Sequence, residues 1–329
     1  MKKFAVALAL LLSSTVAANA QPKELTVAAF GGAYTEAIKK HIGEFEAANN
    51  VVVKFVPASG ADGLAKAMAK EVDVIHADMV WAYRGQFQDA FEKLDPAIVT
   101  NLAALYPRAR VSDYTVITNF GLYGIAYNPK LVDAPTSWLD LWKPEFKGRV
   151  TTAGFDAANL ELLVLMARLN GGDEDNIDPG FAKMAELGKN ITVFYNQHAQ
   201  LLDLFRHEDV VMARWIRGRV DWAKTQGVDL AFVAPKEGAI AMVSTAHVVK
   251  GSPNKELAMK FVNHLLSEAN QIGYATDLGY TPARAGLDLA GADVPYGEEA
   301  VNSLLISDWA KIVPKMDAWK ERWDKEVAR

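Results

Sequence analysis

The stretch Leu25-Thr26-Val27-Ala28-Ala29-Phe30-Gly31-Gly32-Ala33-Tyr34 decides the fold class of this 329-residue chain. Apolar side chains alternate with polar or small ones up to Ala29, which predicts a strand, and the two glycines end it. Apolar side chains then recur at helical spacing over residues 38–48. Residues 51–56 and 72–75 are expected as the next strands. This alternation of strand and helix predicts an α/β fold with a largely parallel sheet.

Helix starts marked by proline continue the pattern toward the C-terminus. Asp178-Pro179 and Ser252-Pro253 each place a capping side chain before a proline, and an apolar stripe follows both. From Lys311 onward, apolar residues that include Trp319 and Trp323 share one helical face. We expect this last helix to dock on the core rather than to bind a partner.

The first twenty residues have the pattern of a secretory signal peptide. Lys2 and Lys3 precede an apolar run over residues 4–12, and Ala18-Asn19-Ala20 is a small-residue cleavage site. The apolar run is too short to span a bilayer, which argues against the alternative of an uncleaved anchor. We therefore expect a protein that begins at Gln21 and is released into a periplasm.

The composition argues against several functions. Acidic residues outnumber basic ones, 40 to 35, so nucleic acid is not expected as a partner. Without any cysteine, the chain can form neither disulfides nor a lipid-modified anchor. Its six histidines show no paired metal spacing, and no nucleophile elbow, phosphate loop or dinucleotide fingerprint occurs. We therefore expect no metal, no cofactor and no enzymatic activity.

Several short segments, taken in order, resemble one protein family. The order and spacing are similar to those of bacterial solute-binding proteins of the spermidine/putrescine-binding type, from about residue 25 to about residue 282. The segments are FGGAY at 30–34, PTSWLDLW at 135–142, FKGRV at 146–150, PKEGA at 235–239, the capped helix after Ser252, and GYTP at 279–282.

The resemblance implies a two-lobed periplasmic binding protein fold of type II, with a ligand cleft between the lobes. The first lobe would contain residues 21–121 and 246–329, including the C-terminal helices, and the second would contain residues 122–245. A hinge is expected near residues 121–127 and 245–248, and closure about it would trap a ligand. The protein would act as a monomeric receptor that delivers a small solute to the permease of an ABC importer.

The resemblance also places candidate ligand contacts in the first lobe. Gly31 and Gly32 would let a ligand approach backbone N–H groups where a helix starts, although an ordinary tight turn would need the same residues. Tyr34 and Tyr280 match aromatic contacts of the family. After the third strand, Asp78 and Trp81 occupy a loop that contacts ligand in relatives, and a packing role for this tryptophan is the alternative.

In the second lobe, the segment from Arg214 to Trp222 is the most informative. Trp215 matches a cleft tryptophan of the family, and Arg219 follows it by four residues, as in some relatives that bind amino-acid-like ligands. Arg217 and Arg219 could each hold a carboxylate or phosphonate through paired hydrogen bonds, or could belong to a solvated basic helix face.

The acidic residues that polyamine binders use are incomplete in this chain. Asp156 can match one of them only with an inserted residue, and it could be a plain helix cap instead. Asn159 and Ser244 stand where two further carboxylates are expected. Because an unpaired buried ammonium is costly, these replacements disfavour a polycation.

The ligand expected from these residues is a small organic solute with an acidic group. It could be a carboxylate, a phosphonate or a zwitterion such as an ω-amino acid. A polyamine, putrescine or spermidine, is the first alternative. An enzyme on the same scaffold is the second, and a role in chemotaxis or signalling stays open. The sequence does not name the ligand.

Overall fold

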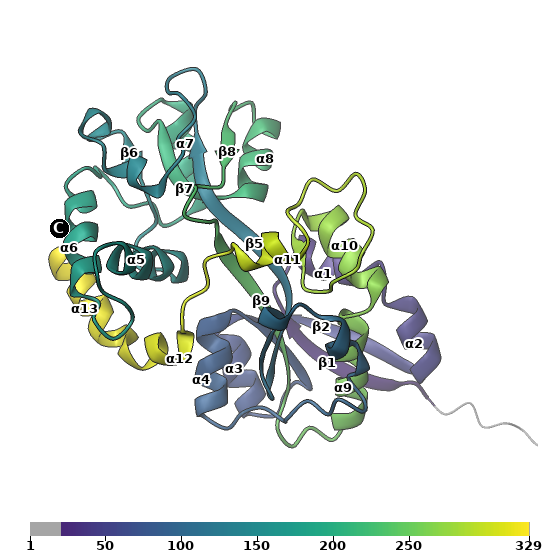
Figure 1. Ribbon diagram of the computed structural model, residues 1–329. Coiled ribbons are helices and arrows are strands. Elements are labelled where there is room, and N and C mark those ends of the chain that lie inside the picture. Colours follow the sequence, from purple (N-terminus) through teal and green to yellow (C-terminus); the bar gives the residue numbers. More distant parts are fainter. Residues whose placement is uncertain (1–20, 329) are drawn as a thin grey trace, which may run out of the picture.

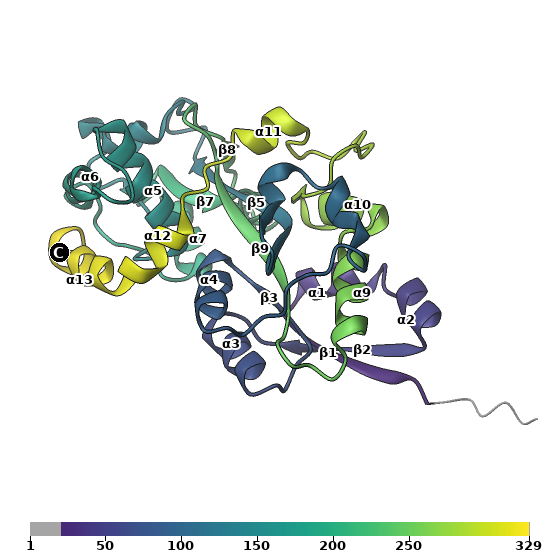
Figure 2. The same cartoon turned by 60° about the horizontal axis from the view of Figure 1, so that its bottom comes forward.

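One ten-stranded sheet runs through the molecule, with the strand order β2-β1-β3-β9-β5-β7-β6 (Figures 1 and 2). The computed structural model describes residues 21–328, so the predicted signal peptide lies outside the described residues. We call the half built on β1, β2 and β3 the first lobe, and the half built on β6, β7 and β8 the second lobe. None of the described helices is long and apolar enough to cross a membrane.

The first lobe follows the predicted alternation of strands and helices. Its elements are β1 (Lys23–Ala29), α1 (Ala33–Lys39), α2 (Gly43–Asn49), β2 (Val51–Pro57), α3 (Gly60–Met68), β3 (Val74–Ala77), α4 (Met79–Phe87), α9 (Lys255–Leu265), α10 (Glu268–Leu278) and β10 (Thr281–Pro282). The single helix expected over residues 38–48 is wrong, because the chain turns between α1 and α2. Its apolar side chains Ile38, Ile42 and Phe45 are nevertheless all buried.

The second lobe contributes a smaller part of the sheet than the first. Its elements are β6 (Val150–Thr151), α5 (Ala157–Leu169), α6 (Asp178–Gly188), α7 (His198–Arg206), β7 (Met212–Ile216), α8 (Arg217–Thr225) and β8 (Ala231–Val233). Helix α5 is apolar on nearly all sides and is buried along most of its length, as a helix enclosed by other elements must be.

Two long strands join the lobes. Strand β5 (Thr115–Tyr127) pairs with β9 (Ile240–Val248) and then with β7, and both of these pairings are antiparallel. The sheet is therefore mixed, and the expectation of a largely parallel sheet is wrong. Residues 245–248, expected at the hinge, pair with β3 inside the first lobe. Residues 240–244 are the part of β9 that pairs with β5 between the lobes.

A third segment also passes between the lobes. Residues 303–308, here called the third crossing, lead from α11 (Glu298–Asn302) to α12 (Trp309–Ile312). Leu305 extends the sheet at this point, since its N–H donates to Ala239 O at 2.8 Å and its carbonyl accepts from Ala241 N at 3.1 Å.

The C-terminal helix α13 (Met316–Glu326) then packs on the second lobe (Figure 1). Trp319 meets Phe181 of α6 edge to face, with ring centroids 6.4 Å apart, and Trp323 meets Phe155 at 5.9 Å. The docked helix predicted from the sequence therefore exists, but it covers the second lobe and not the first, where we expected the C-terminal helices.

Candidate ligand-binding cleft

A cavity of about 760 Å³ lies where the two lobes meet. Both lobes contribute to its walls, together with the strands β5 and β9 and with Trp309, which follows the third crossing directly. The residues that line it are Phe30, Gly31, Gly32, Ala33, Tyr34, Asp78, Met79, Tyr123, Ala157, Ala158, Glu161, Ile216, Gly218, Arg219, Trp222, Ala241, Met242, Val243, Ser244, Asp277, Leu278, Tyr280 and Trp309. A cavity of this size, mostly apolar with a few polar groups, suits a small organic molecule.

Helices from both lobes begin at the cavity wall. Helix α4 of the first lobe starts there after Asp78, and α5 and α8 of the second lobe start there with residues 157–158 and 218–219. The N-terminus of a helix carries unpaired N–H groups and a partial positive charge. Asp78 and Asp156 already cap α4 and α5, whereas α8 has no side-chain cap, so the start of α8, next to Arg219, favours an anionic group on the ligand.

Gly32 shapes the start of α1 at the same wall. It is the N-cap residue with φ of 67°, a backbone conformation that side chains other than glycine disfavour. A Cβ atom placed there would meet no other atom within 4 Å, so its surroundings are open. The glycine is required by the turn and also leaves backbone accessible from the cavity.

The floor of the cavity is polar but uncharged. The Tyr34 hydroxyl lies 3.2 Å from His76 Nδ1 and 3.2 Å from Thr118 Oγ1, and it accepts from Asn119 Nδ2 at 3.3 Å. Burial raises the pKa of Tyr34, so its hydroxyl stays protonated. Burial, helped by the nearby His247, lowers the pKa of His76 to about 3, so this imidazole is neutral.

Two side chains of opposite charge line the cavity from opposite lobes. Asp78 caps α4 by accepting from Trp81 N at 3.1 Å, burial raises its pKa, and it forms no ion pair with any described residue. Arg219 is exposed, and its guanidinium lies 5.7 Å from the ring centroid of Trp222. Within the described chain, Arg219 makes no hydrogen bond or ion pair. Both groups are therefore available to a ligand.

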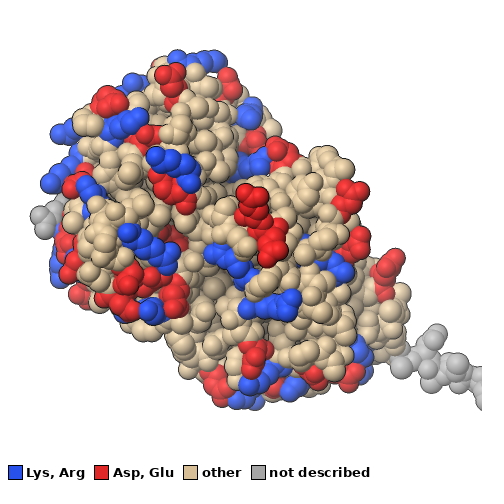
Figure 3. Space-filling model, viewed as in Figure 1, with Lys and Arg blue, Asp and Glu red and all other residues tan. Residues whose placement is uncertain are grey.

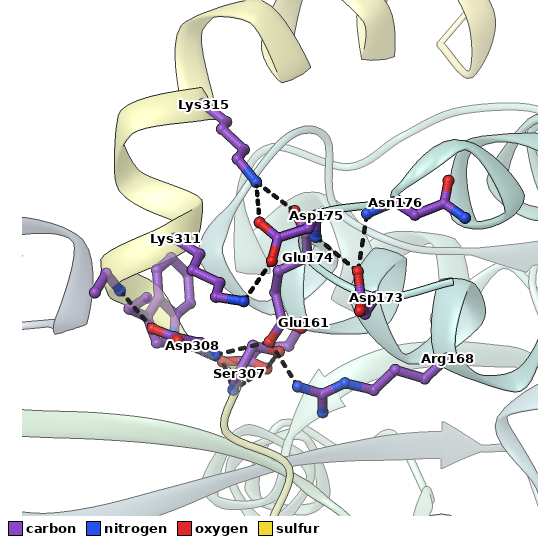
Figure 4. A network of polar contacts seen from close by, with 12 residues as sticks. Glu161, Arg168, Asp173, Glu174, Asp175, Asn176, Ser307, Asp308, Lys311 and Lys315 are labelled. Carbon is purple, nitrogen blue, oxygen red and sulfur yellow. Dashed lines mark hydrogen bonds and ion pairs between the residues drawn. The ribbon is translucent and has the colours of Figure 1, made fainter. Parts of the chain in front are cut away.

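The other two acidic side chains of the lining are already engaged. Asp277 accepts from Lys40 Nζ at 2.7 Å. Glu161 is 3 % exposed and holds the third crossing (Figure 4). It accepts from Ser307 N at 2.8 Å, from Ser307 Oγ at 2.5 Å and from Trp309 Nε1 at 2.7 Å. Burial raises the pKa of Glu161 to about 7.

The structure brings seven of the twelve predicted site residues together. They lie on six different elements or turns, and what they have in common is that all line the cavity. They are Gly31, Gly32, Tyr34, Asp78, Arg219, Ser244 and Tyr280. That each contacts a ligand stays a prediction.

Trp81 and Trp215 lie outside the lining. Trp215 is 0 % exposed; its Nε1 donates to His198 Nδ1 at 2.9 Å, and its ring stacks on Phe205 with centroids 6.1 Å apart. Its side chain belongs to the core of the second lobe, because neighbouring residues of a strand point to opposite faces. The Arg84 guanidinium lies 4.9 Å from the ring centroid of Trp81. Both tryptophans therefore pack against neighbouring side chains and do not line the cavity.

Three predicted polar residues also lie outside the lining, each with partners of its own. Asp156 pairs with Arg214 Nη2 at 2.6 Å and caps α5 through Asn159 N. Asn159 is completely buried and accepts from Arg214 Nε at 3.0 Å. Arg217 pairs with Asp293 of the first lobe and lines a smaller neighbouring pocket.

Sequence reasoning missed several lining residues. Trp222 could have been found, since it follows Arg219 at the i, i+3 spacing of one helix face. Tyr123 lies within the glycine-flanked hinge segment that the sequence singled out. Glu161 and Trp309 carried no signal, because they are 148 positions apart and meet only through the third crossing.

On the face shown in Figure 3, acidic and basic side chains are interspersed. In comparisons with known proteins, residues 40–299 match the family described as bacterial extracellular solute-binding protein.

Two curated relatives and one solved structure are informative. The chain is 31 % identical to the gamma-aminobutyric acid-binding protein of Pseudomonas aeruginosa, over 84 % of this chain and 81 % of that protein. It is 28 % identical to the spermidine/putrescine-binding periplasmic protein of Escherichia coli, over 62 % of this chain and 61 % of that protein. The structure of the Atu4243-GABA receptor superposes with a TM-score of 0.77 at 24 % identity, covering 93 % of this chain and 98 % of the other. The chain thus belongs to the bacterial extracellular solute-binding proteins and is a solute-binding receptor of ABC transporters, not an enzyme.

Proposed function

We propose that this receptor binds a small zwitterion, an ω-amino acid of the size of γ-aminobutyrate. One observation carries the proposal: Asp78 and Arg219 face one cavity from opposite lobes, and neither has an ion-pair partner among the described residues. A carboxylate at Arg219 would gain charge-assisted hydrogen bonds, and an ammonium at Asp78 would compensate a partly desolvated carboxylate. A ligand with both groups would join the lobes.

The small number of free acidic side chains in the lining disfavours a polyamine. Each ammonium in a closed cleft needs an acidic partner, since an unpaired buried charge is costly. Asp277 and Glu161 are engaged with Lys40 and with the third crossing, and Asp156 is paired with Arg214. One acidic side chain of the lining is left for a cation, which suffices for one ammonium and not for two.

The name of the Pseudomonas relative agrees with this ligand class, and the name of the Escherichia coli relative supports the polyamine alternative.

We further propose that the mature chain starts at Gln21, resides in the periplasm as a monomer and hands its ligand to an ABC permease. Amino-terminal sequencing of periplasmic protein tests the first of these points; an intact Met1 would contradict it.

Calorimetry with γ-aminobutyrate, putrescine and spermidine tests the ligand class. We expect γ-aminobutyrate to bind at least tenfold more tightly than either polyamine, a difference of about 1.4 kcal/mol. Arg219→Ala and Asp78→Asn should each weaken γ-aminobutyrate by tenfold or more, because each leaves one charge of the ligand unpaired. Arg206→Ala, which removes an exposed arginine paired with Asp203 within the second lobe, is the matched control. Tight spermidine binding that survives Arg219→Ala would overturn the proposal.

A further inference from the structure

A buried ion pair lies directly behind the cavity wall, at the start of α5. Arg214 is 0 % exposed, and its Nη2 donates to Asp156 at 2.6 Å. Its Nε donates to Thr152 Oγ1 at 2.9 Å and to Asn159 at 3.0 Å. Arg214 is thus held by three residues that precede or begin α5, and its guanidinium also contacts the ring of Tyr123, a lining residue.

The pair touches the cavity through two neighbours. Asp156 is followed directly by Ala157 and Ala158, which line the cavity, and its own side chain is 36 % exposed. The Arg214 guanidinium lies 4.8 Å from the ring centroid of Tyr123, which is also a lining residue. The charges of Asp156 and Arg214 are therefore separated from a bound molecule by about one layer of side chains.

The Arg214 guanidinium is less completely satisfied than the Asp156 carboxylate in this pair. Arg214 Nη1 is buried and has no hydrogen-bond partner among the described residues. A buried donor without an acceptor is costly, and the cost is larger for a charged group. Asp156, by contrast, has an ion pair and a capping hydrogen bond. An incoming ammonium would meet an occupied carboxylate and an under-compensated guanidinium.

We propose that Arg214 is a specificity-determining residue that excludes a second ammonium from the cavity. It does so by holding Asp156, the carboxylate at the N-terminus of α5, in an ion pair with its own buried guanidinium. The inference rests on the proposed function, since it explains why a molecule with one ammonium and one carboxylate is accepted where a diamine is rejected. Arg214 acts through Asp156 and need not touch the bound molecule.

The test measures binding of γ-aminobutyrate and putrescine to the full-length mature protein and to Arg214→Met, which keeps much of the side-chain volume without the charge. We expect putrescine to bind at least tenfold more tightly to Arg214→Met than to the parent, because Asp156 is released. The double variant Asp156→Asn/Arg214→Met should lose this gain. Arg206→Met, which removes an exposed arginine paired with Asp203 in the same lobe, should change neither affinity.

Asp156→Asn keeps the helix cap and gives a second test if Arg214→Met does not fold. We expect it to leave γ-aminobutyrate affinity undiminished and to weaken putrescine further. A tenfold loss of γ-aminobutyrate affinity in Asp156→Asn would overturn the assignment, since Asp156 would then hold the ammonium itself. Unchanged putrescine binding by folded Arg214→Met would overturn it as well. If the parent protein prefers putrescine to γ-aminobutyrate, the proposed function itself fails, and that outcome is seen before any variant is compared.

Discussion

Trp215 and Trp222 stand close together in sequence but in different environments. Trp215 is fully enclosed between Phe205 and His198, whereas Trp222 is only partly buried and lines the cavity beneath Arg219. The strand β7 directs Trp215 into the core of the second lobe, and the first turns of α8 bring Trp222 to the cleft. The same residue type therefore has two roles that burial separates.

Replacing each tryptophan should reveal the two roles. Trp215→Ala should lower the free energy of unfolding by about 3–5 kcal/mol, because it leaves a large cavity in the core. Trp222→Ala should lower it much less but weaken γ-aminobutyrate binding severalfold. Urea unfolding and calorimetry on both variants measure the contrast. Weaker binding by folded Trp215→Phe, with Trp222→Ala unaffected, would contradict this reading.

Glu161 makes stability depend on pH in a defined window. Burial raises its pKa from 4.5 to about 7, so between these values the folded protein retains a proton that the unfolded chain has released. Its contribution to stability is therefore present below pH 4.5 and is lost as the pH rises toward 7. Glu161→Gln cannot ionise at this position. The difference in the free energy of unfolding between the parent and this variant should therefore shrink as the pH rises from 4.5 to about 7.

Urea unfolding at several pH values tests this prediction. Ser307→Ala is the matched comparison, since removing the hydroxyl at 2.5 Å takes away a hydrogen bond that lowers the pKa of Glu161. That variant should lose stability more steeply with pH than the parent does. If the free energies of unfolding of the parent and of Glu161→Gln change with pH in parallel, another group causes the pH dependence in this range.

Among the elements, the third crossing is fixed at both of its ends. At the end in the first lobe, Arg108 Nη1 donates to the carbonyls of Val301, Asn302 and Leu304 at 2.8–3.0 Å. At the end in the second lobe, Glu161 holds Ser307 and Trp309. The segment can therefore transmit a lobe movement only by bending between these two anchors, beside β9.

Loss of the first anchor should loosen the crossing without unfolding either lobe. In Arg108→Met, amide hydrogen exchange over residues 301–306 should accelerate at least severalfold, because three carbonyls lose their shared donor. Arg110→Met is the control, since Arg110 donates to Ala103 and Leu105 and not to the crossing. Exchange rates that stay at the parent level in Arg108→Met would mean that the pairing of Leu305 holds the segment alone.

At the scale of the whole molecule, three connections join the two lobes around one cavity. Such an arrangement permits hinge bending while each lobe keeps its own core. We expect the bending where the pairing of strands is shared between the lobes, over residues 119–123 of β5 and 240–244 of β9. The exposed ion pair between Arg217 and Asp293 joins the lobes outside this region.

Binding should bring the lobes together. Small-angle scattering of the parent protein should show a smaller radius of gyration when γ-aminobutyrate is saturating, because closure buries the cavity surface. Arg219→Ala at the same concentration provides the control, as its binding should be weakened. An unchanged radius at verified saturation would show that this receptor binds without closing.

Patterns that are local in the chain determined the fold class. The strand of residues 25–29 and the glycine turn after it follow from alternation and chain-breaking glycines, which act over a few residues. Helices α1 and α2 replace the single helix expected over residues 38–48. The ordered family motifs indicated the solute-binding class, and the glycine turn and helix starts predicted where a ligand could meet backbone N–H groups. These features need no knowledge of distant neighbours.

Only the tertiary structure decided which charges face the ligand. Asp156 and Arg214 are 58 positions apart, and their pairing removes from the cleft a carboxylate that the sequence offered as a ligand contact. Among the described residues, Arg219 has no ion-pair partner, although Arg217, two residues away, is paired across the lobes. Trp309 reaches the cavity only because the third crossing returns to the second lobe. The physical reason is that the availability of a charge depends on which partner packing brings within hydrogen-bond distance, and no local pattern encodes that partner.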